Sequence, residues 1–335
     1  MGVDEMLVRQ SSCVNQRMRD MHCTKCQEIC PHEAIEINPS GQILIQQNCT
    51  ACGLCFSKCP AQVFSWKEQQ RYPLKMKKGT LEIFCNQIKC DGYIACLAKL
   101  DPYELAYLAI QAEVILCFDQ AECGQCNANA VVYVQRMVKQ VNAFLSAVGI
   151  KQIVFLGERK KVAEKLNRRD LLNFFFTKAK QSIGEVLPVT AQVLSFRELL
   201  IDELKCKLPQ VKGGAAPLFK GAKVTEDCNM CGVCVRACRK QAMRIVEDEK
   251  NQWMMLQHKQ SACSGCGVCQ HVCPQKSLEI SDKNSTLENV FCKEYVSILQ
   301  KHLTICEKCG AIIKGIYTIC RKCEQKRIKK LQSIY

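Results

Sequence analysis

The stretch Cys49-Thr50-Ala51-Cys52-Gly53-Leu54-Cys55-Phe56-Ser57-Lys58-Cys59 places four cysteines at the spacing Cys-x2-Cys-x2-Cys-x3-Cys. The same spacing recurs in residues 228–238 and 263–273, and a shorter run comprises Cys23, Cys26 and Cys30. Cys13 precedes this shorter run by ten residues. Thiolates at this spacing hold three corners of a [4Fe–4S] cube, and the fourth cysteine of each run reaches a neighbouring cube. The pattern therefore predicts iron–sulfur clusters and electron transfer.

Disulfides and structural zinc are the alternatives for a chain with 28 cysteines in 335 residues. Disulfides are favoured in secreted domains. Residues 1–5 do not begin a basic segment followed by an apolar one, so we expect no secretory signal and a cytoplasmic location. Zinc sites with four cysteines usually combine two separated Cys-x2-Cys pairs rather than three cysteines in close succession. The spacing favours clusters over both alternatives.

The repeat extends beyond the cysteines. After the last cysteine of each run, a small or β-branched residue and a large apolar residue follow at fixed offsets: Ala34-Ile35, Val63-Phe64, Ala242-Met243 and Ser277-Leu278. Between the halves of each pair we expect a hairpin, formed by 34–37 with 42–45 and by 242–247 with 252–256. Four copies in two adjacent pairs indicate the internal duplication of a two-cluster module.

Residues 13–66 and 222–281 resemble bacterial two-cluster [4Fe–4S] ferredoxin domains, which fold as two βαβ-like halves related by a pseudo-twofold axis. The resemblance implies four ligand sets, each named here by its first residue. They are the Cys13 set (Cys13, Cys23, Cys26, Cys59), the Cys30 set (Cys30, Cys49, Cys52, Cys55), the Cys228 set (Cys228, Cys231, Cys234, Cys273) and the Cys238 set (Cys238, Cys263, Cys266, Cys269). The chain departs from the family in two places. Arg239 replaces a proline, and a nine-residue insertion separates Cys13 from Cys23.

Residues 78–205 differ in character from the two modules, because predicted strands alternate there with predicted helices. The strands are expected at 81–84, 113–117, 152–156 and 183–189, and the helices at 102–111, 130–148, from Glu158 onward, and at 195–204. Strands and helices that alternate at this spacing are typical of a small α/β domain with a parallel sheet.

Five cysteines of this middle domain are candidates for a redox-active thiol site or a further cluster: Cys85, Cys90, Cys117, Cys123 and Cys126. Cys85 and Cys117 end predicted strands, and Cys123 and Cys126 lie in the predicted loop that follows, so these thiols are expected at one crevice. The domain is loosely similar to subunits that link hydrogenases to heterodisulfide reductases, where such domains carry a further cluster. In the alternative interpretation, Cys96 and Cys90 pack as small hydrophobic residues.

The C-terminal segment contains two Cys-x2-Cys pairs, formed by Cys306 with Cys309 and by Cys320 with Cys323. These pairs, with a short apolar hairpin between them, resemble a zinc ribbon, which holds one structural Zn²⁺. A single iron, as in rubredoxins, is the alternative, because the two kinds of site share ligand type and geometry. Cys206 and Cys292 stand apart and are expected to bind no metal.

The formal net charge of +15 treats every cysteine as neutral. Four cubes with their thiolates add about −8 and a four-thiolate zinc site about −2, which leaves a holoprotein near +5. This balance favours docking of an acidic redox partner and makes nucleic-acid binding unlikely. The most apolar stretch, 105–118, is too short to cross a bilayer, so we expect no direct membrane insertion.

The expected fold is multidomain, α+β in the modules and α/β between them. The expected segments are a ferredoxin-type module at 1–70, an α/β domain at 78–205, a linker at 206–221, a second module at 222–283 and a zinc-ribbon-like end with a basic tail at 300–335. No Walker loop, dinucleotide glycine fingerprint or nucleophile elbow is present.

The predicted function is a polyferredoxin-like carrier that relays single electrons to or from a hydrogenase, a formate dehydrogenase or a molybdoenzyme. Two alternatives belong to other classes. One is an oxidoreductase with its own cysteine-based or iron–sulfur active site in the middle domain, and the other is a redox sensor or a maturation factor for a metalloenzyme.

Overall fold

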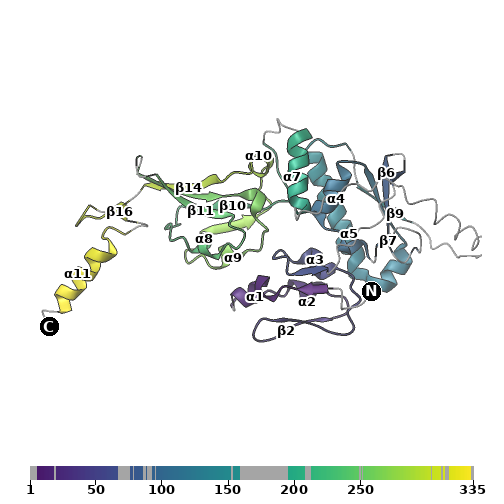
Figure 1. Ribbon diagram of the computed structural model, residues 1–335, viewed down its shortest axis with the longest axis horizontal. Helices are drawn as coiled ribbons and strands as arrows, with labels where there is room; N and C mark the ends of the chain where they lie inside the picture. Colours follow the sequence, from purple (N-terminus) through teal and green to yellow (C-terminus); the bar gives the residue numbers. More distant parts are fainter. Residues whose placement is uncertain are drawn as a thin grey trace, which may run out of the picture. The chain divides into compact units, whose positions relative to one another are not determined.

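The computed structural model describes residues 6–66 except 19, 76–151 with gaps at 78, 86–87, 89–92 and 95, 154–158, 195–207, and 213–332 with gaps at 249, 251, 303, 311 and 314–316. The chain forms two compact units, Met1–Pro209 and Gln210–Tyr335, and Figure 1 labels many of their elements. Each unit is described by itself below.

The first part of the N-terminal unit is built from short elements. They are β1 (Met6–Val8), η2 (Gln10–Ser12), α1 (Val14–Arg17), α2 (Lys25–Ile29), β2 (Ile35–Ile37), β3 (Ile43–Ile45), α3 (Leu54–Lys58) and β4 (Phe64–Trp66). Strands β2 and β3 form the predicted hairpin, and β1 pairs antiparallel with β4. Ile35, Ile43, Val63 and Phe64 are buried in one core together with cluster-motif cysteines. The apolar residues that follow each cysteine run thus face the cysteines.

The second part of this unit contains a mixed sheet. Its elements are β5 (Met76–Lys77), β6 (Thr80–Cys85), β7 (Tyr93–Ile94), η4 (Leu97–Lys99), α4 (Pro102–Ala109), β8 (Glu113–Phe118), α5 (Gln120–Ala147), β9 (Val154–Glu158) and α7 (Phe196–Lys207). Strand β6 pairs in parallel with β7 and β8, and β8 pairs in parallel with β9, whereas β5 is antiparallel to β6. The predicted small parallel sheet is confirmed.

Helix α5 begins earlier than the sequence predicted. Cys123 and Cys126 were expected in the loop before a helix at 130–148, but residues 120–129 form the first turns of α5. The carboxylate of Asp119 accepts hydrogen bonds from the backbone N–H groups of Ala121 and Glu122, at 3.0 and 3.2 Å. This N-cap satisfies amide groups that the helix cannot pair internally. The cap stabilises a helical start despite the weak propensity of Gly124.

Two expected elements of the middle domain, the helix from Glu158 and the strand at 183–189, lie outside the described residues. The expected helix at 195–204 is present as α7, whose Arg197 lies over the ring of Tyr103 on α4. Helix α5 is attached to β9 by Asn142, whose side-chain amide donates to the carbonyl of Val154 and accepts from its N–H. This reciprocal pair fixes the long helix against the sheet edge.

The C-terminal unit repeats the module architecture and adds to it. Its elements are β10 (Gly221–Val224), α8 (Val233–Ala237), β11 (Met243–Asp248), β12 (Trp253–His258), η5 (Gln260–Ala262), α9 (Val268–His271), β13 (Leu278–Ser281), α10 (Leu287–Phe291), β14 (Val296–His302), β15 (Thr304–Ile305), β16 (Ile312–Ile313) and α11 (Arg321–Gln332). Strands β11 and β12 form the predicted hairpin. Strand β14, which the sequence did not predict, pairs antiparallel with β12 and makes the sheet three-stranded.

Residues 206–207 of the segment expected to be a linker belong to α7, whereas its residues from 213 onward pack within the C-terminal unit. Ala216 and Phe219 are fully buried, and the N–H of Ala216 donates to the carbonyl of Ser285. The N–H of Leu287 donates to the carbonyl of Gly214 in the same region.

Among the described residues no helix has both the length and the apolar character needed to cross a membrane.

The central strand of the sheet provides a stability test. Leu116 on β8 is fully buried, so the substitution Leu116→Ala should lower the free energy of unfolding by about 2–5 kcal/mol through lost burial and a cavity. Val132→Ala is the control, because Val132 is 51% exposed and its loss should cost no more than about 0.5 kcal/mol. Denaturant unfolding followed by circular dichroism measures both; equal effects would contradict the assignment of Leu116 to the core.

Candidate metal centres

The structure brings the four thiols of the Cys13 set together. Burial, together with the nearby thiols of Cys59, Cys23 and Cys13, raises the pKa of Cys26 to about 12. Cys13 and Cys26 are buried, and the other two are partly buried. Closely spaced thiols in an apolar surrounding hold their protons until a cation displaces them. This set can therefore hold a cluster of the predicted kind.

Asn15 explains how Cys13 joins its set across the nine-residue insertion. Its side-chain amide donates to the carbonyl of Cys23 at 2.8 Å and accepts from the N–H of Cys23 at 2.7 Å. The amide thus mimics a pair of backbone hydrogen bonds between α1 and the start of the Cys23–Cys26 loop. Asn15 is 7% exposed, so solvent competes little for these two bonds.

The Cys30 set also converges, around the loop before α3. Burial raises the pKa of Cys52, and the nearby thiols of Cys30 and Cys49 add to the shift. The pKa of Cys55 is raised by burial and then by Cys52, Cys49 and Cys26. Because Cys26 belongs to the Cys13 set, the two sets of this module are close enough to interact electrostatically.

The C-terminal unit shows the same arrangement. Burial raises the pKa of Cys234 to about 11, with contributions from its set members Cys228, Cys231 and Cys273. Burial also raises the pKa of Cys269, as do the thiols of its own set and that of Cys234. The Cys228 and Cys238 sets therefore adjoin each other. That each of the four sets holds a cube stays a prediction.

The loops between the cysteines turn through left-handed backbone conformations. Gly53, Gly232 and Gly267 have φ values of 84°, 71° and 78°, and each precedes a short helix that carries cluster-motif cysteines. Glycine adopts this conformation without steric cost. After the runs, the N–H groups of Ala34 and Ala242 donate to the sulfurs of Cys30 and Cys238, at 3.3 and 3.2 Å. Such N–H···S bonds stabilise sulfur that carries negative charge.

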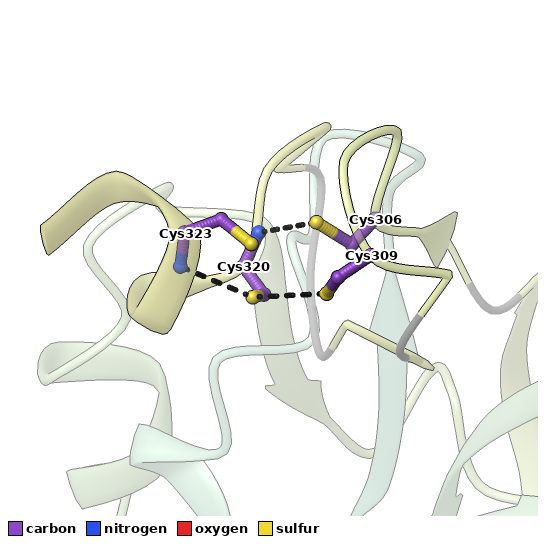
Figure 2. Close-up of side chains that lie close together, drawn as sticks. All are labelled: Cys306, Cys309, Cys320 and Cys323. Carbon is purple, nitrogen blue, oxygen red and sulfur yellow. Dashed lines mark hydrogen bonds between the residues drawn. The ribbon is translucent and has the colours of Figure 1, made fainter. Parts of the chain in front are cut away.

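The four C-terminal cysteines form a tighter group, shown in Figure 2. The sulfurs of Cys306, Cys309, Cys320 and Cys323 all lie within 4.8 Å of one another. The Cys309 and Cys320 sulfurs are 3.7 Å apart, close to the roughly 3.8 Å that a tetrahedral site with metal–sulfur distances of about 2.3 Å requires. The N–H of Cys320 donates to the Cys306 sulfur and lowers the pKa of Cys306 to about 6. The geometry suits one zinc or iron ion.

The middle-domain candidates divide into three groups. Cys85 ends β6 as predicted, and Cys123 and Cys126 lie one turn apart on α5 instead of in a loop. Cys117 lies on β8, fully buried, and its thiol is 3.9 Å from the carbonyl oxygen of Ile115. Cys90 lies outside the described residues.

Cys96, which sequence reasoning assigned to packing, lies close to these candidates. Burial, together with the nearby thiols of Cys85, Cys52 and Cys123, raises its pKa to about 12. Burial raises the pKa of Cys123 to about 11, with Cys85 and Cys126 contributing. The interpretation of Cys96 as a packed hydrophobic residue thus misses its thiol neighbours. Cys96 lies two residues after the end of β7, a short strand that the sequence did not predict, so its place near a strand end gave no signal in the sequence.

Comparison with protein families agrees with the two modules. Residues 21–64 and residues 227–277 each match a 4Fe-4S dicluster domain. Two such domains imply four [4Fe–4S] clusters and point to an iron–sulfur electron-transfer protein. No curated protein matches the chain. The first match begins after Cys13, so the place of Cys13 in its set rests on the geometry described above.

The Cys13 set gives a direct test by metal content. Cys13→Ser should reduce the iron content from about sixteen to about twelve atoms per chain, because one cube loses a ligand. Cys206→Ser is the control, since Cys206 is an exposed cysteine on α7. Iron and acid-labile sulfide are measured on anaerobically purified protein. An unchanged iron content in Cys13→Ser would show that Cys13 is not a ligand.

The C-terminal site should bind one zinc ion with an affinity that falls as the pH falls. Hydrogen bonds with Cys309 and Cys320 raise the pKa of Cys323 to about 12, so the metal must displace its proton at neutral pH. Competition with a chromophoric chelator at pH 6 and pH 8 measures this difference. Cys309→Ser should lose the ion, whereas Cys292→Ser should retain it. Equal affinities at both pH values would contradict the prediction.

Proposed function

We propose that this protein relays single electrons through four [4Fe–4S] clusters to or from a partner oxidoreductase. Two observations support the proposal: residues 21–64 and 227–277 each match a 4Fe-4S dicluster domain, and thiols within each proposed ligand set lie near enough to raise one another's pKa. Each cube supplies one-electron exchange between iron(III) and iron(II). The chain supplies sulfur ligands, N–H donors and an apolar cover, which together set the reduction potentials.

Electron transfer within each module is favoured by the closeness of its two sets. Cys55 and Cys26 belong to different sets yet influence each other's ionisation, and the same holds for Cys269 and Cys234. Electron transfer weakens steeply with distance, so two adjacent cubes exchange electrons faster than either exchanges with a distant acceptor. An electron that enters a module at one cube can therefore leave it from the other.

The partner in this proposal is a protein oxidoreductase, such as a hydrogenase, a formate dehydrogenase or a molybdoenzyme. The formal charge of +15 falls to about +5 once four cubes and a zinc site are loaded, which still favours an acidic partner surface. One Zn²⁺ at the C-terminal site would have a structural role. A closed four-thiolate zinc ion leaves no position for a substrate.

A second candidate function is an oxidoreductase whose own centre lies in the middle domain. Cys96 lies near Cys85 and Cys123 and also near Cys52, which belongs to the Cys30 set. The pKa values of Cys96 and Cys123 are raised by burial and thiol neighbours, as they are for Cys26 and Cys234 in the cluster motifs. This shared pattern favours a further iron–sulfur centre, fed by the neighbouring cube, over a free thiolate nucleophile.

Metal analysis separates the two candidates. Four cubes predict about sixteen irons and about sixteen sulfides per chain, and a further cluster adds two to four of each. In the second case Cys123→Ser should remove only the additional iron, whereas Cys206→Ser should leave the total unchanged. A content near sixteen in both variants and in the parent protein leaves the carrier as the function. A content well below sixteen would overturn the proposal of four cubes.

Electron throughput then separates a carrier from a redox sensor or a maturation factor. The reduced protein should pass electrons continuously from a chemical reductant to a one-electron dye, and each cube should appear in an anaerobic titration followed by electron paramagnetic resonance. A single stoichiometric turnover without sustained transfer would contradict the carrier function.

A further inference from the structure

A lysine of the middle domain packs against the loop between Cys52 and Cys55, two cysteines of the Cys30 set. Lys99 ends η4, and it is only 4% exposed with its Nζ atom buried. A Cβ atom placed on Gly53 would lie 2.4 Å from Cγ of Lys99 and 3.1 Å from its Cα. The stem of Lys99 therefore runs directly over Gly53, between the ligands Cys52 and Cys55.

The contact belongs to a packed interface within the N-terminal unit. The hydroxyl of Ser57 on α3 donates to the carbonyl of Ala98, the residue before Lys99, at 2.6 Å. Tyr133 on α5 also hydrogen-bonds the side chain of Ser57. Because backbone and side-chain contacts hold α3 against η4, Lys99 has a fixed place beside the cluster loop. Two features require glycine at position 53: its φ of 84°, and the close approach of Lys99, which leaves no room for a Cβ.

A buried ammonium group on a side chain that packs against a cluster loop acts on the charge of that cluster. A [4Fe–4S] cube with four thiolates carries about −2 when oxidised and about −3 when reduced. The attraction between the cube and a fixed positive charge is therefore about 1.5 times as strong in the reduced state as in the oxidised state. Burial of the ammonium group increases this stabilisation of the reduced cube, because solvent and salt screen a buried charge less than an exposed one.

We propose that Lys99 is a positioning residue that raises the reduction potential of the cube held by the Cys30 set. The inference rests on the proposed function, since it requires a cube at Cys30, Cys49, Cys52 and Cys55. The middle domain would thereby make this cube the electron acceptor of its module. Electrons that enter at the Cys13 set would collect at the cube next to Cys96.

The C-terminal unit contains a useful comparison. Lys220 also lies on a cluster loop, with Cγ 2.7 Å from where a Cβ on Gly265 would be. Its ammonium lies 3.5 Å from the carboxylate of Asp282, and its side chain is 35% exposed. Solvent screens this exposed charge and weakens its field at the cube. We expect Lys220 to influence its cluster less than Lys99 does.

The test is an anaerobic redox titration of the full chain followed by electron paramagnetic resonance. In Lys99→Met, the ratio of reduced to oxidised cube at a fixed potential should fall about tenfold for one of the four cubes, a shift of about 59 mV for a one-electron couple. The affected signal should be the one missing from Cys49→Ser protein. Lys99→Arg keeps the charge and should keep the parent potential.

Lys58→Met is the matched control, because Lys58 is an exposed lysine at the end of α3 on the same module. It should shift no potential, and Lys220→Met should shift one by less than Lys99→Met does. Four unchanged potentials in Lys99→Met, or an equal shift in Lys58→Met, would overturn the inference. So would a shift in Lys99→Arg as large as that in Lys99→Met, since packing and not charge would then be responsible.

Loss of the cube is also informative, and Lys99→Gln serves as a second neutral variant. If both neutral variants lose about four irons while Lys99→Arg retains them, the positive charge is needed beside the cube and the inference stands. If all three lose them, the stem alone matters and the inference fails. Parent protein with about sixteen irons and four reducible cubes supports the proposed function whatever the Lys99 variants show.

Discussion

Four sulfur atoms that must converge on one small, negatively charged cluster are the constraint on which both modules depend. Sulfurs in this state repel one another, so the chain has to surround them with N–H groups and turn sharply between them. Left-handed turns at Gly53, Gly232 and Gly267 meet the second requirement. The N–H groups that donate to Cys30 and Cys238 meet the first. Short helices and two-stranded ribbons suffice as a scaffold because the cluster itself is the centre of each core.

In each module, the last cysteine of one run lies with the cysteines of the other run, so the two halves depend on each other. Cys59 lies with the first run and Cys30 with the second, so neither half can complete its ligand set alone. This exchange places the two sets of a module side by side, which suits electron transfer between them. The middle domain also contacts this module: Cys96 lies near Cys52, and Lys99 packs against Gly53 in the loop that follows Cys52. A cluster module and an α/β domain thus share an interface at the loop between Cys52 and Cys55.

Prediction from sequence succeeded where the signal was local. The hairpins, the parallel strands β6, β8 and β9, and helices α4 and α7 lie where periodicity and turn residues place them. The prediction was wrong for Cys123 and Cys126, because Asp119 caps a helix through a stretch whose composition suggested a loop. Strand β14 was missed because β12, far along the chain, provides its hydrogen-bonding partner.

By itself, the sequence determined the cluster motifs, the pairing of the modules and the C-terminal pair of cysteine knuckles. Cysteine spacing is sufficient for this, since ligands within one or two turns of chain can bind a common cluster only at certain separations. Tertiary structure alone decided that Asn15 ties the segment after Cys13 to Cys23, that Cys96 lies near other thiols and that Lys99 packs against Gly53. Each of these contacts depends on the packing of whole elements against one another, and chain spacing does not encode that packing.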